Sequence, residues 1–249
     1  MNCLSLETQF QLIGGLVLLL AAYAIWLGQL TLDRLPGNYR NPVLALELVA
    51  SGDHIDQINR ASKQRKGKTV TANAFLSEQV CKDYGFIVIY VLLFSALGLL
   101  LARLTSPPLR WTALVGVACA VLAGVLDFVE NSGMRKALAL TEGGASDDLA
   151  NMIRYPSLAK WALLFVFSVL IGIVFLLARQ PGSLSALAIG LLWLLGGFVG
   201  LSGVIANLYK PRSYVMFPGA VVLQSVGLLW MAGVFLFCPA IIISSLTNQ

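Results

Sequence analysis

Long runs of apolar residues, separated by polar segments, make up most of the chain. Six runs are long enough to cross a bilayer as helices, because about 20 helical residues span a hydrocarbon core of about 30 Å. The runs cover approximately residues 10–30, 84–102, 111–129, 161–178, 184–206 and 219–243. The pattern predicts an all-α fold, a polytopic transmembrane helical bundle of six spans in which residues 1–249 form a single membrane domain.

The polar segment at residues 31–83 is the longest connection between two of these runs. Residues 43–50 within it are apolar but too few to span a bilayer, and they include Glu47. A further helix is expected to start near Thr69 or Thr71 and to continue into the second apolar run. We expect this first loop to contain short amphipathic helices that lie against the membrane face.

Lys and Arg are distributed very unevenly among the connections. The first, third and fifth loops carry fourteen of the 17 Lys and Arg residues, and the other two connections carry three. Cytoplasmic loops of membrane proteins are enriched in Lys and Arg. This bias predicts a multi-pass protein of the cell membrane, of the bacterial inner membrane type, with both termini outside. The basic residues of the cytoplasmic loops account for the net charge of +5, so we expect no nucleic-acid partner.

The composition agrees with lipid as the solvent of this chain. Hydrophobic residues make up 58% and charged residues 12%, against roughly 25% charged in an average soluble domain. The 4 cysteines show neither CxxC nor Cys/His spacing, so we expect no disulfide and no metal site. The sequence also has no nucleotide-binding loop, GxSxG or HExxH motif. No cofactor is therefore expected.

The most informative polar stretch lies near the end of the third run. Asp127 precedes Glu130 by three residues and Asn131 by four, so the three side chains share one face of a helix. An acidic side chain at the centre of a span costs about 2.5 to 3.5 kcal/mol, and less near an end. We therefore expect these groups to face protein and to have partners.

Two features would offset the cost of these acids. The helix can continue beyond the membrane to about Leu140, and cations on the same side can neutralise the carboxylates. The candidate cations are Arg135, Arg154, Lys160, Lys210 and Arg212. Candidates for the same ligand-binding or ion-pair site are Asp83, Asp127, Glu130, Asn131, Glu47 and Tyr209. A functional site and a structural ion pair that sets helix register both remain open.

Three short stretches resemble uncharacterised bacterial multi-span membrane proteins. They are Leu46-Glu47-Leu48, Asp83-Tyr84 with Phe86 and Tyr90, and the LDxxEN-like stretch Leu126-Asp127 with Glu130-Asn131. The resemblance covers roughly residues 45–135. It favours a joint role for these acids and implies no particular activity.

Basic residues of the first loop are candidates for contact with lipid headgroups. Lys63, Arg65, Lys66 and Lys68 form a dense cluster, and each such charge near an anionic membrane surface contributes about 1 kcal/mol of attraction. The alternative is that these residues only determine topology.

Three functions remain open at this point. The first is a binding or accessory protein whose cytoplasm-facing polar site holds a lipid headgroup or a partner membrane subunit. The second is a transporter or channel that uses the intramembrane acids. The third is a membrane enzyme that acts on a hydrophobic substrate at the cytoplasmic leaflet, with Asp127 or Glu130 as acid or base. Membrane lipids are expected partners in each case.

Overall fold

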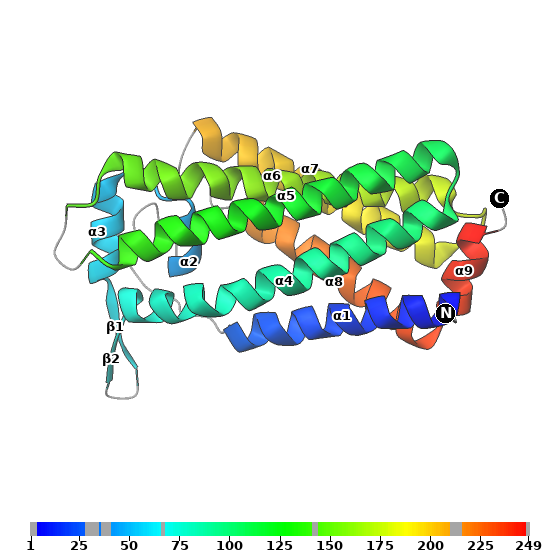
Figure 1. Ribbon diagram of the computed structural model, residues 1–249, viewed down its shortest axis with the longest axis horizontal. Helices are drawn as coiled ribbons and strands as arrows, with labels where there is room; N and C mark the ends of the chain where they lie inside the picture. Colours follow the sequence, from blue (N-terminus) through cyan, green and yellow to red (C-terminus); the bar gives the residue numbers. More distant parts are fainter. Residues whose placement is uncertain are drawn as a thin grey trace.

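The fold was analysed in a computed structural model that describes residues 4–27, 35, 41–65, 68–140, 144–209 and 216–247. Six long helices run side by side (Figure 1). They are α1 (Leu6–Leu27), α4 (Ala72–Leu104), α5 (Pro107–Leu138), α6 (Asp147–Ala178), α7 (Leu184–Tyr209) and α8 (Met216–Phe237). The shorter elements are α2 (Pro42–Glu47), α3 (Gly52–Arg60), β1 (Ser62–Arg65), β2 (Lys68–Thr71) and α9 (Pro239–Thr247).

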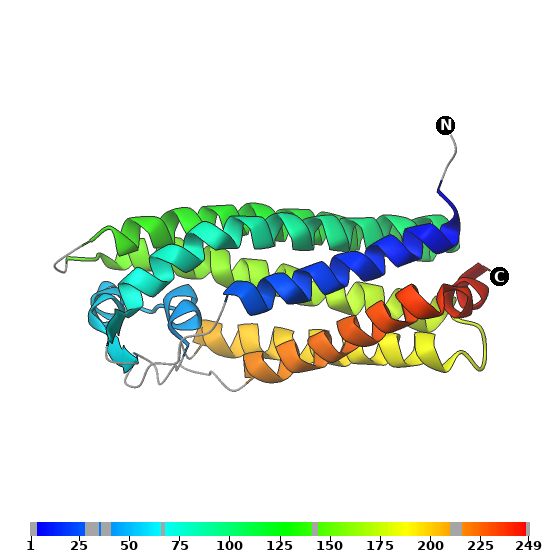
Figure 2. The same cartoon turned by 90° about the horizontal axis from the view of Figure 1, so that it is seen from below.

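The long helices confirm the predicted all-α bundle. In the described part of the chain, all six long helices are long and apolar enough to cross a membrane. The chain is therefore a multi-pass membrane protein. Three of the helices, α4, α5 and α6, have 33, 32 and 32 residues, which exceeds the roughly 20 residues that a span requires. Their extra turns extend the bundle at one end, where they support α2 and α3 (Figure 2).

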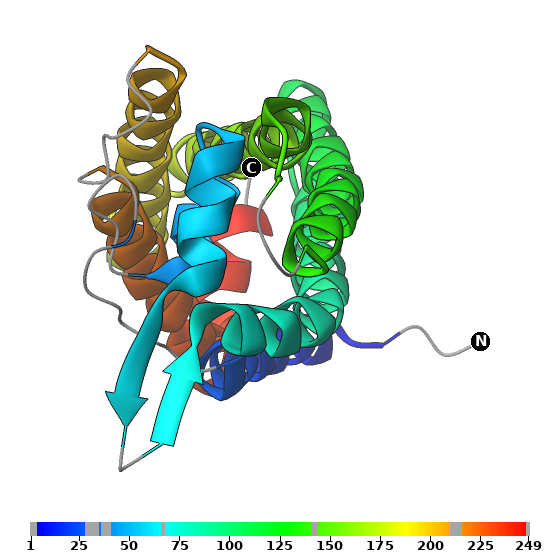
Figure 3. The same ribbon diagram turned by 90° about the vertical axis from the view of Figure 1, so that its left-hand side faces the viewer.

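The two ends of the bundle differ in what they carry. The short elements α2, α3 and the β1–β2 hairpin gather at one end, which we call the loop end, and both termini lie at the other, the terminal end (Figures 1 and 2). Seen along the bundle from the loop end, α3 lies across the helix ends and the hairpin projects to one side (Figure 3). The described elements of the first loop are therefore part of the folded bundle at this end.

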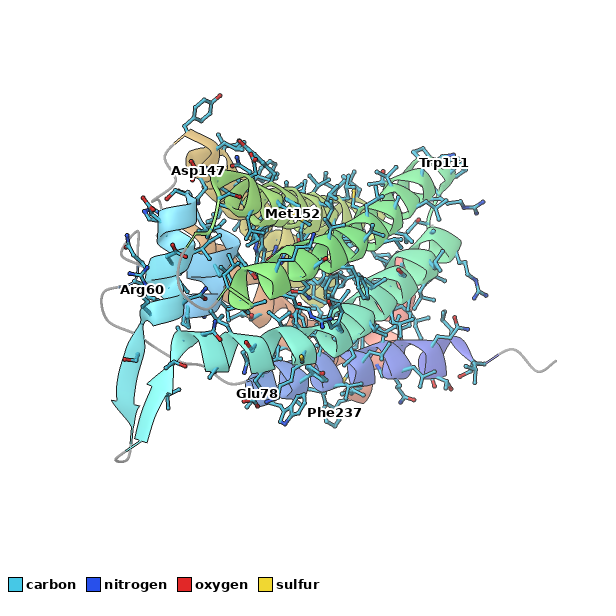
Figure 4. The ribbon with its side chains drawn as sticks, turned by 60° about the vertical axis from the view of Figure 1, so that its left-hand side comes forward. Arg60, Glu78, Trp111, Asp147, Met152 and Phe237 are labelled. Carbon is cyan, nitrogen blue, oxygen red and sulfur yellow. The ribbon has the colours of Figure 1, made fainter. Side chains whose placement is uncertain are left out.

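Side-chain hydrogen bonds attach α3 to the extended helices. The backbone N–H of Gly52 donates to Oδ1 of Asp147 at 2.8 Å, and Nδ2 of Asn59 donates to the carbonyl of Ala137 at 3.0 Å. Figure 4 shows Asp147 and Arg60 at this end and Trp111 at the opposite end of the bundle. Buried Ile55 and Ile58 of α3 add apolar contact with the bundle, so the loop end has its own hydrophobic core.

The connections at the terminal end are short. Helix α4 is followed after Thr105 and Ser106 by α5, and residues 179–183 connect α6 to α7. Each pair packs as an antiparallel hairpin (Figure 1). The predicted extension of the third span is also confirmed, because α5 continues to Leu138.

The last predicted span differs from the structure. A single helix over residues 219–243 was expected, but α8 ends at Phe237 and α9 begins at Pro239. Proline has no N–H to donate, and its ring disfavours the helical conformation at the preceding residue. The apolar run is therefore divided into a span and a short helix.

The first loop contains a pair of β-strands in addition to the predicted helices. Two of its elements are the predicted short helices, and the third helix starts beside Thr71, whose Oγ1 accepts from the backbone N–H of Ala74 at 3.2 Å. The basic segment before this cap forms an antiparallel hairpin in which Ser62 pairs with Thr71. These strands were not expected from the sequence.

Candidate functional site

A buried lysine in the half of α6 nearer the loop end contacts three carboxylates. Nζ of Lys160 lies 2.7 Å from Oε2 of Glu130, 2.9 Å from Oδ1 of Asp127 and 3.5 Å from Oε1 of Glu47. Only 5% of Lys160 and none of Glu130 is exposed. The three acids come from α5 and from the end of α2, so this ion-pair group joins three separate elements.

Further hydrogen bonds extend the group to α4. The hydroxyl of Tyr90 donates to Oδ2 of Asp127 at 2.9 Å, and Nδ2 of Asn131 donates to Oδ2 of Asp83 at 2.8 Å. The indole N–H of Trp161 donates to Oε2 of Glu47 at 3.0 Å. We call the whole set the Lys160 cluster. It consists of Glu47, Asp83, Tyr90, Asp127, Glu130, Asn131, Lys160 and Trp161.

The helical repeat of α5 explains why its polar groups enter this cluster. Asp127, Glu130 and Asn131 are buried, whereas Phe128 and Val129 between them are 46% and 42% exposed. One face of α5 thus meets protein while the other is available to lipid. The prediction that Asp127, Glu130 and Asn131 share one face of the helix and face protein is confirmed.

Small residues allow α4 to approach this face closely. A Cβ added at Gly124 would lie 2.5 Å from Cγ2 of Val91 on α4, which is too close for a real contact. Such small-residue contacts are typical of tightly packed membrane helices. The close approach brings Tyr90 and Asp83 of α4 within hydrogen-bond distance of α5.

Most of the predicted site residues meet in the structure. Glu47, Asp83, Asp127, Glu130 and Asn131 all belong to the Lys160 cluster. Tyr209 does not, because it is 84% exposed at the end of α7. Its aromatic side chain therefore lies on the surface.

The structure also decides among the candidate cations for the described part of the chain. Lys160 pairs with the acids, whereas Nη2 of Arg154 donates to the backbone carbonyl of Asn207 at 2.7 Å and Arg135 is exposed. Lys210 and Arg212 lie outside the described residues. Of the lipid-headgroup candidates, Lys63 and Arg65 lie on β1 and Lys68 on β2, while Lys66 is outside the described residues.

Several residues of the cluster were missed as site residues. Tyr90 lies seven residues after Asp83, which is two helical turns and hence the same face. Lys160 was only one of five candidate cations, although it directly precedes Trp161 at the start of an apolar run. The signals available in the sequence were a lysine and an aromatic residue placed directly at the start of an apolar run.

A cavity of about 210 Å³ extends from the cluster into the bundle. We call it the bundle cavity. Its polar end is formed by cluster residues, and its other end mainly by aromatic and aliphatic side chains, together with the hydrogen-bonded pair Ser168 and Gln224. The lining residues are Leu20, Glu47, Asp83, Phe86, Tyr90, Phe94, Asp127, Lys160, Trp161, Leu164, Ser168, Trp193, Val221, Gln224, Ser225 and Leu228. Val221 and Ser225 are exposed, which indicates an opening beside α8.

A second cavity of about 190 Å³ lies on the loop side of the cluster. Its lining includes Asn41 and Val43 at the start of α2, and Gln79 and Val80 of α4. Glu47 and Asp83 line both cavities. These two carboxyl groups therefore separate the bundle cavity from the loop-end cavity.

The cluster has more acids than bases. Four carboxyl groups, those of Glu47, Asp83, Asp127 and Glu130, accompany the single ammonium of Lys160. If all were ionised, the cluster would carry a net charge of −3, and uncompensated buried charge costs several kcal/mol per ion. The arrangement can therefore hold protons or a cationic group. Among the described residues, no group of three or more His, Cys, Asp or Glu is placed to hold a metal ion.

Comparisons with known proteins assign no family or function to this chain. No protein-family model matches the chain, and neither the curated proteins nor the solved structures provide a match. The cluster and its cavities are thus the basis for any functional assignment.

Proposed function

We propose that this protein binds an amphiphilic molecule of the membrane in the bundle cavity. One observation carries the proposal: the cavity is polar and charged at the Lys160 cluster and largely apolar at the opposite end, near Phe94 and Trp193. A molecule with a polar head and an apolar body matches both ends. Ligand sites are typically apolar cavities with a few convergent polar groups.

The length of the cavity supports this assignment. Asp83 and Phe94 both line it. Phe94 is the eleventh residue after Asp83 on the same helix, which corresponds to about 16 Å along the bundle axis. Asp127 lies near the loop end of the third apolar run. The polar end thus lies near the membrane interface, and the apolar end lies deeper in the bilayer.

Filling the opening should prevent binding. We expect Ser225→Trp to lower the occupancy of a co-purified amphiphile about tenfold, because Ser225 is an exposed residue that lines the cavity and an indole would occupy the opening. Native mass spectrometry of the purified protein measures the bound fraction. The matched control is Ser202→Trp, at an exposed serine of α7 outside the cavity lining, which should retain the ligand. Equal loss from both variants, or no bound molecule in the wild type, would count against the proposal.

We further propose that the loop end faces the cytoplasm of a bacterial cell, with both termini outside the inner membrane. The distribution of Lys and Arg supports this orientation. The hairpin that carries Lys63, Arg65 and Lys68 would then lie beside the anionic cytoplasmic leaflet, which attracts basic residues. A partner subunit could dock on the same face.

A reporter fused after Gln249 tests the orientation. Alkaline phosphatase, which is active only outside the cytoplasm, should be active there, and green fluorescent protein should be dark. The reverse pattern would place both termini in the cytoplasm. Fusions within the first loop, after Gly67, provide the complementary control and should show the opposite activities.

A transporter is the second candidate, because Glu47 and Asp83 line both cavities. Movement of these two side chains would connect the bundle cavity with the loop end. In a cysteine-free background, a transporter should allow Leu164→Cys, which lines the bundle cavity, to react with a membrane-impermeant thiol reagent from either side of a proteoliposome. A binding protein should react from one side at most. Ile171→Cys, at a fully buried position of α6, should remain unreactive.

A further inference from the structure

We propose that the amphiphile carries a protonated amine, which binds among the carboxylates of the Lys160 cluster. This inference rests on the proposed function and specifies the chemical class of its ligand. It follows from which hydrogen-bond donors and acceptors remain available at the polar end of the bundle cavity.

The donors at the polar end are already committed to carboxylates. An ammonium group has three N–H donors, and Nζ of Lys160 has three carboxylate neighbours. The hydroxyl of Tyr90 and the indole N–H of Trp161 donate to Asp127 and Glu47. A phosphate or carboxylate headgroup would compete for these donors and would add negative charge to an acidic cluster.

Acceptor capacity, in contrast, remains available. Three carboxyl groups, those of Glu47, Asp83 and Asp127, line the bundle cavity beside the single ammonium of Lys160. Glu130 does not line the cavity, but its buried Oε1 also has no hydrogen-bond partner among the described residues. A buried carboxylate oxygen without a donor is unfavourable. The site as a whole therefore lacks positive charge and hydrogen-bond donors, both of which an amine supplies.

The wall next to the acids also suits a cation. Phe86, Tyr90 and Trp161 line the polar part of the bundle cavity, and aromatic faces attract ammonium groups through their π electrons. Nζ of Lys160 already lies 5.4 Å from the centroid of the Trp161 ring.

The test compares three probes with the same 12-carbon chain: dodecylamine, dodecanol and dodecanoate. At pH 7.5 their heads are cationic, neutral and anionic, and native mass spectrometry of the detergent-solubilised protein measures a one-to-one complex. We expect dodecylamine to bind at least tenfold more tightly than the other two. Equal binding of all three would leave the amphiphile site intact and overturn the inference about charge. Binding of none would overturn both.

A single carboxyl variant tests where the amine binds. Asp83→Asn removes one negative charge but keeps an oxygen that can accept from Asn131, so we expect a tenfold loss of dodecylamine affinity with dodecanol binding unchanged. Asp148→Asn removes an exposed acid of α6 at the same end and should change neither affinity. A change below twofold in Asp83→Asn would show that the amine binds elsewhere and would overturn the assignment.

A fourth probe separates two sources of the amine. Lysophosphatidylethanolamine with a 12-carbon chain carries the same amine beyond a phosphate. If it competes with dodecylamine at a comparable concentration, the natural ligand is a zwitterionic membrane lipid. If it fails to compete, the ligand is a lipophilic amine without a phosphate.

Discussion

Replacing Lys160 with methionine should destabilise the protein more than any other single substitution in the cluster. The variant would leave three contacting carboxylates, of Glu47, Asp127 and Glu130, without their cation in a buried site. Removing one partner of a buried ion pair typically costs about 3 to 5 kcal/mol. We expect a large fall in the midpoint of thermal unfolding, measured by tryptophan fluorescence in detergent, or loss of folded protein.

Two further variants make this result interpretable. Lys136→Met removes an exposed lysine of α5 and should leave the unfolding midpoint almost unchanged. Adding Asp127→Asn and Glu130→Gln to Lys160→Met removes two of the unpaired charges and should recover most of the lost stability. A Lys160→Met protein as stable as the wild type would show that the acids are held neutral by protons, so that the ion pairs contribute little.

Substituting Gly172 with alanine should separate α6 from α7. A Cβ at this position would lie 2.8 Å from the backbone N of Leu194 and 2.9 Å from the carbonyl oxygen of Gly190. Both atoms belong to the backbone of α7, so no side-chain rotation can relieve the contact. Overpacking of this kind costs about 1 to 3 kcal/mol, and we expect a lower midpoint of thermal unfolding in detergent.

Gly15→Ala is the matched control for this prediction. Gly15 also lies within a spanning helix, but a Cβ there would have no neighbour within 4 Å. We expect its unfolding midpoint to equal that of the wild type or to rise slightly, since alanine favours helix over glycine. Similar midpoints for the two variants would mean that α6 and α7 can shift apart without cost.

Much of the bundle could be predicted from local sequence. A spanning segment must satisfy its own backbone hydrogen bonds and expose apolar side chains to lipid, so each span leaves a continuous signal of about 20 residues. The spacing of Asp127, Glu130 and Asn131 likewise predicted that their side chains share one helical face. The break before Pro239 also has a local cause, which is the proline itself. The high average hydropathy of the run nevertheless led to the prediction of one uninterrupted helix.

The partners within the site could not be predicted in the same way. Lys160 and Asp127 are 33 residues apart in sequence and meet at 2.9 Å, while Glu47 is 113 residues from Lys160. Five cations on the same predicted side were candidates, and the position of Lys160 at the start of an apolar run did not by itself identify it as the partner. The choice depends on how α5, α6 and α2 pack, which no local pattern specifies.

The six spans and the face of α5 that carries the acids could thus be predicted from local sequence, because lipid imposes the same demand on each helix separately. The packing of the helices was needed to identify Lys160 as their cation, to place Tyr209 outside the site and to reveal the cavity beside the cluster. These features arise from contacts between helices, where close approach at residues such as Gly124 and Gly172 sets which side chains meet.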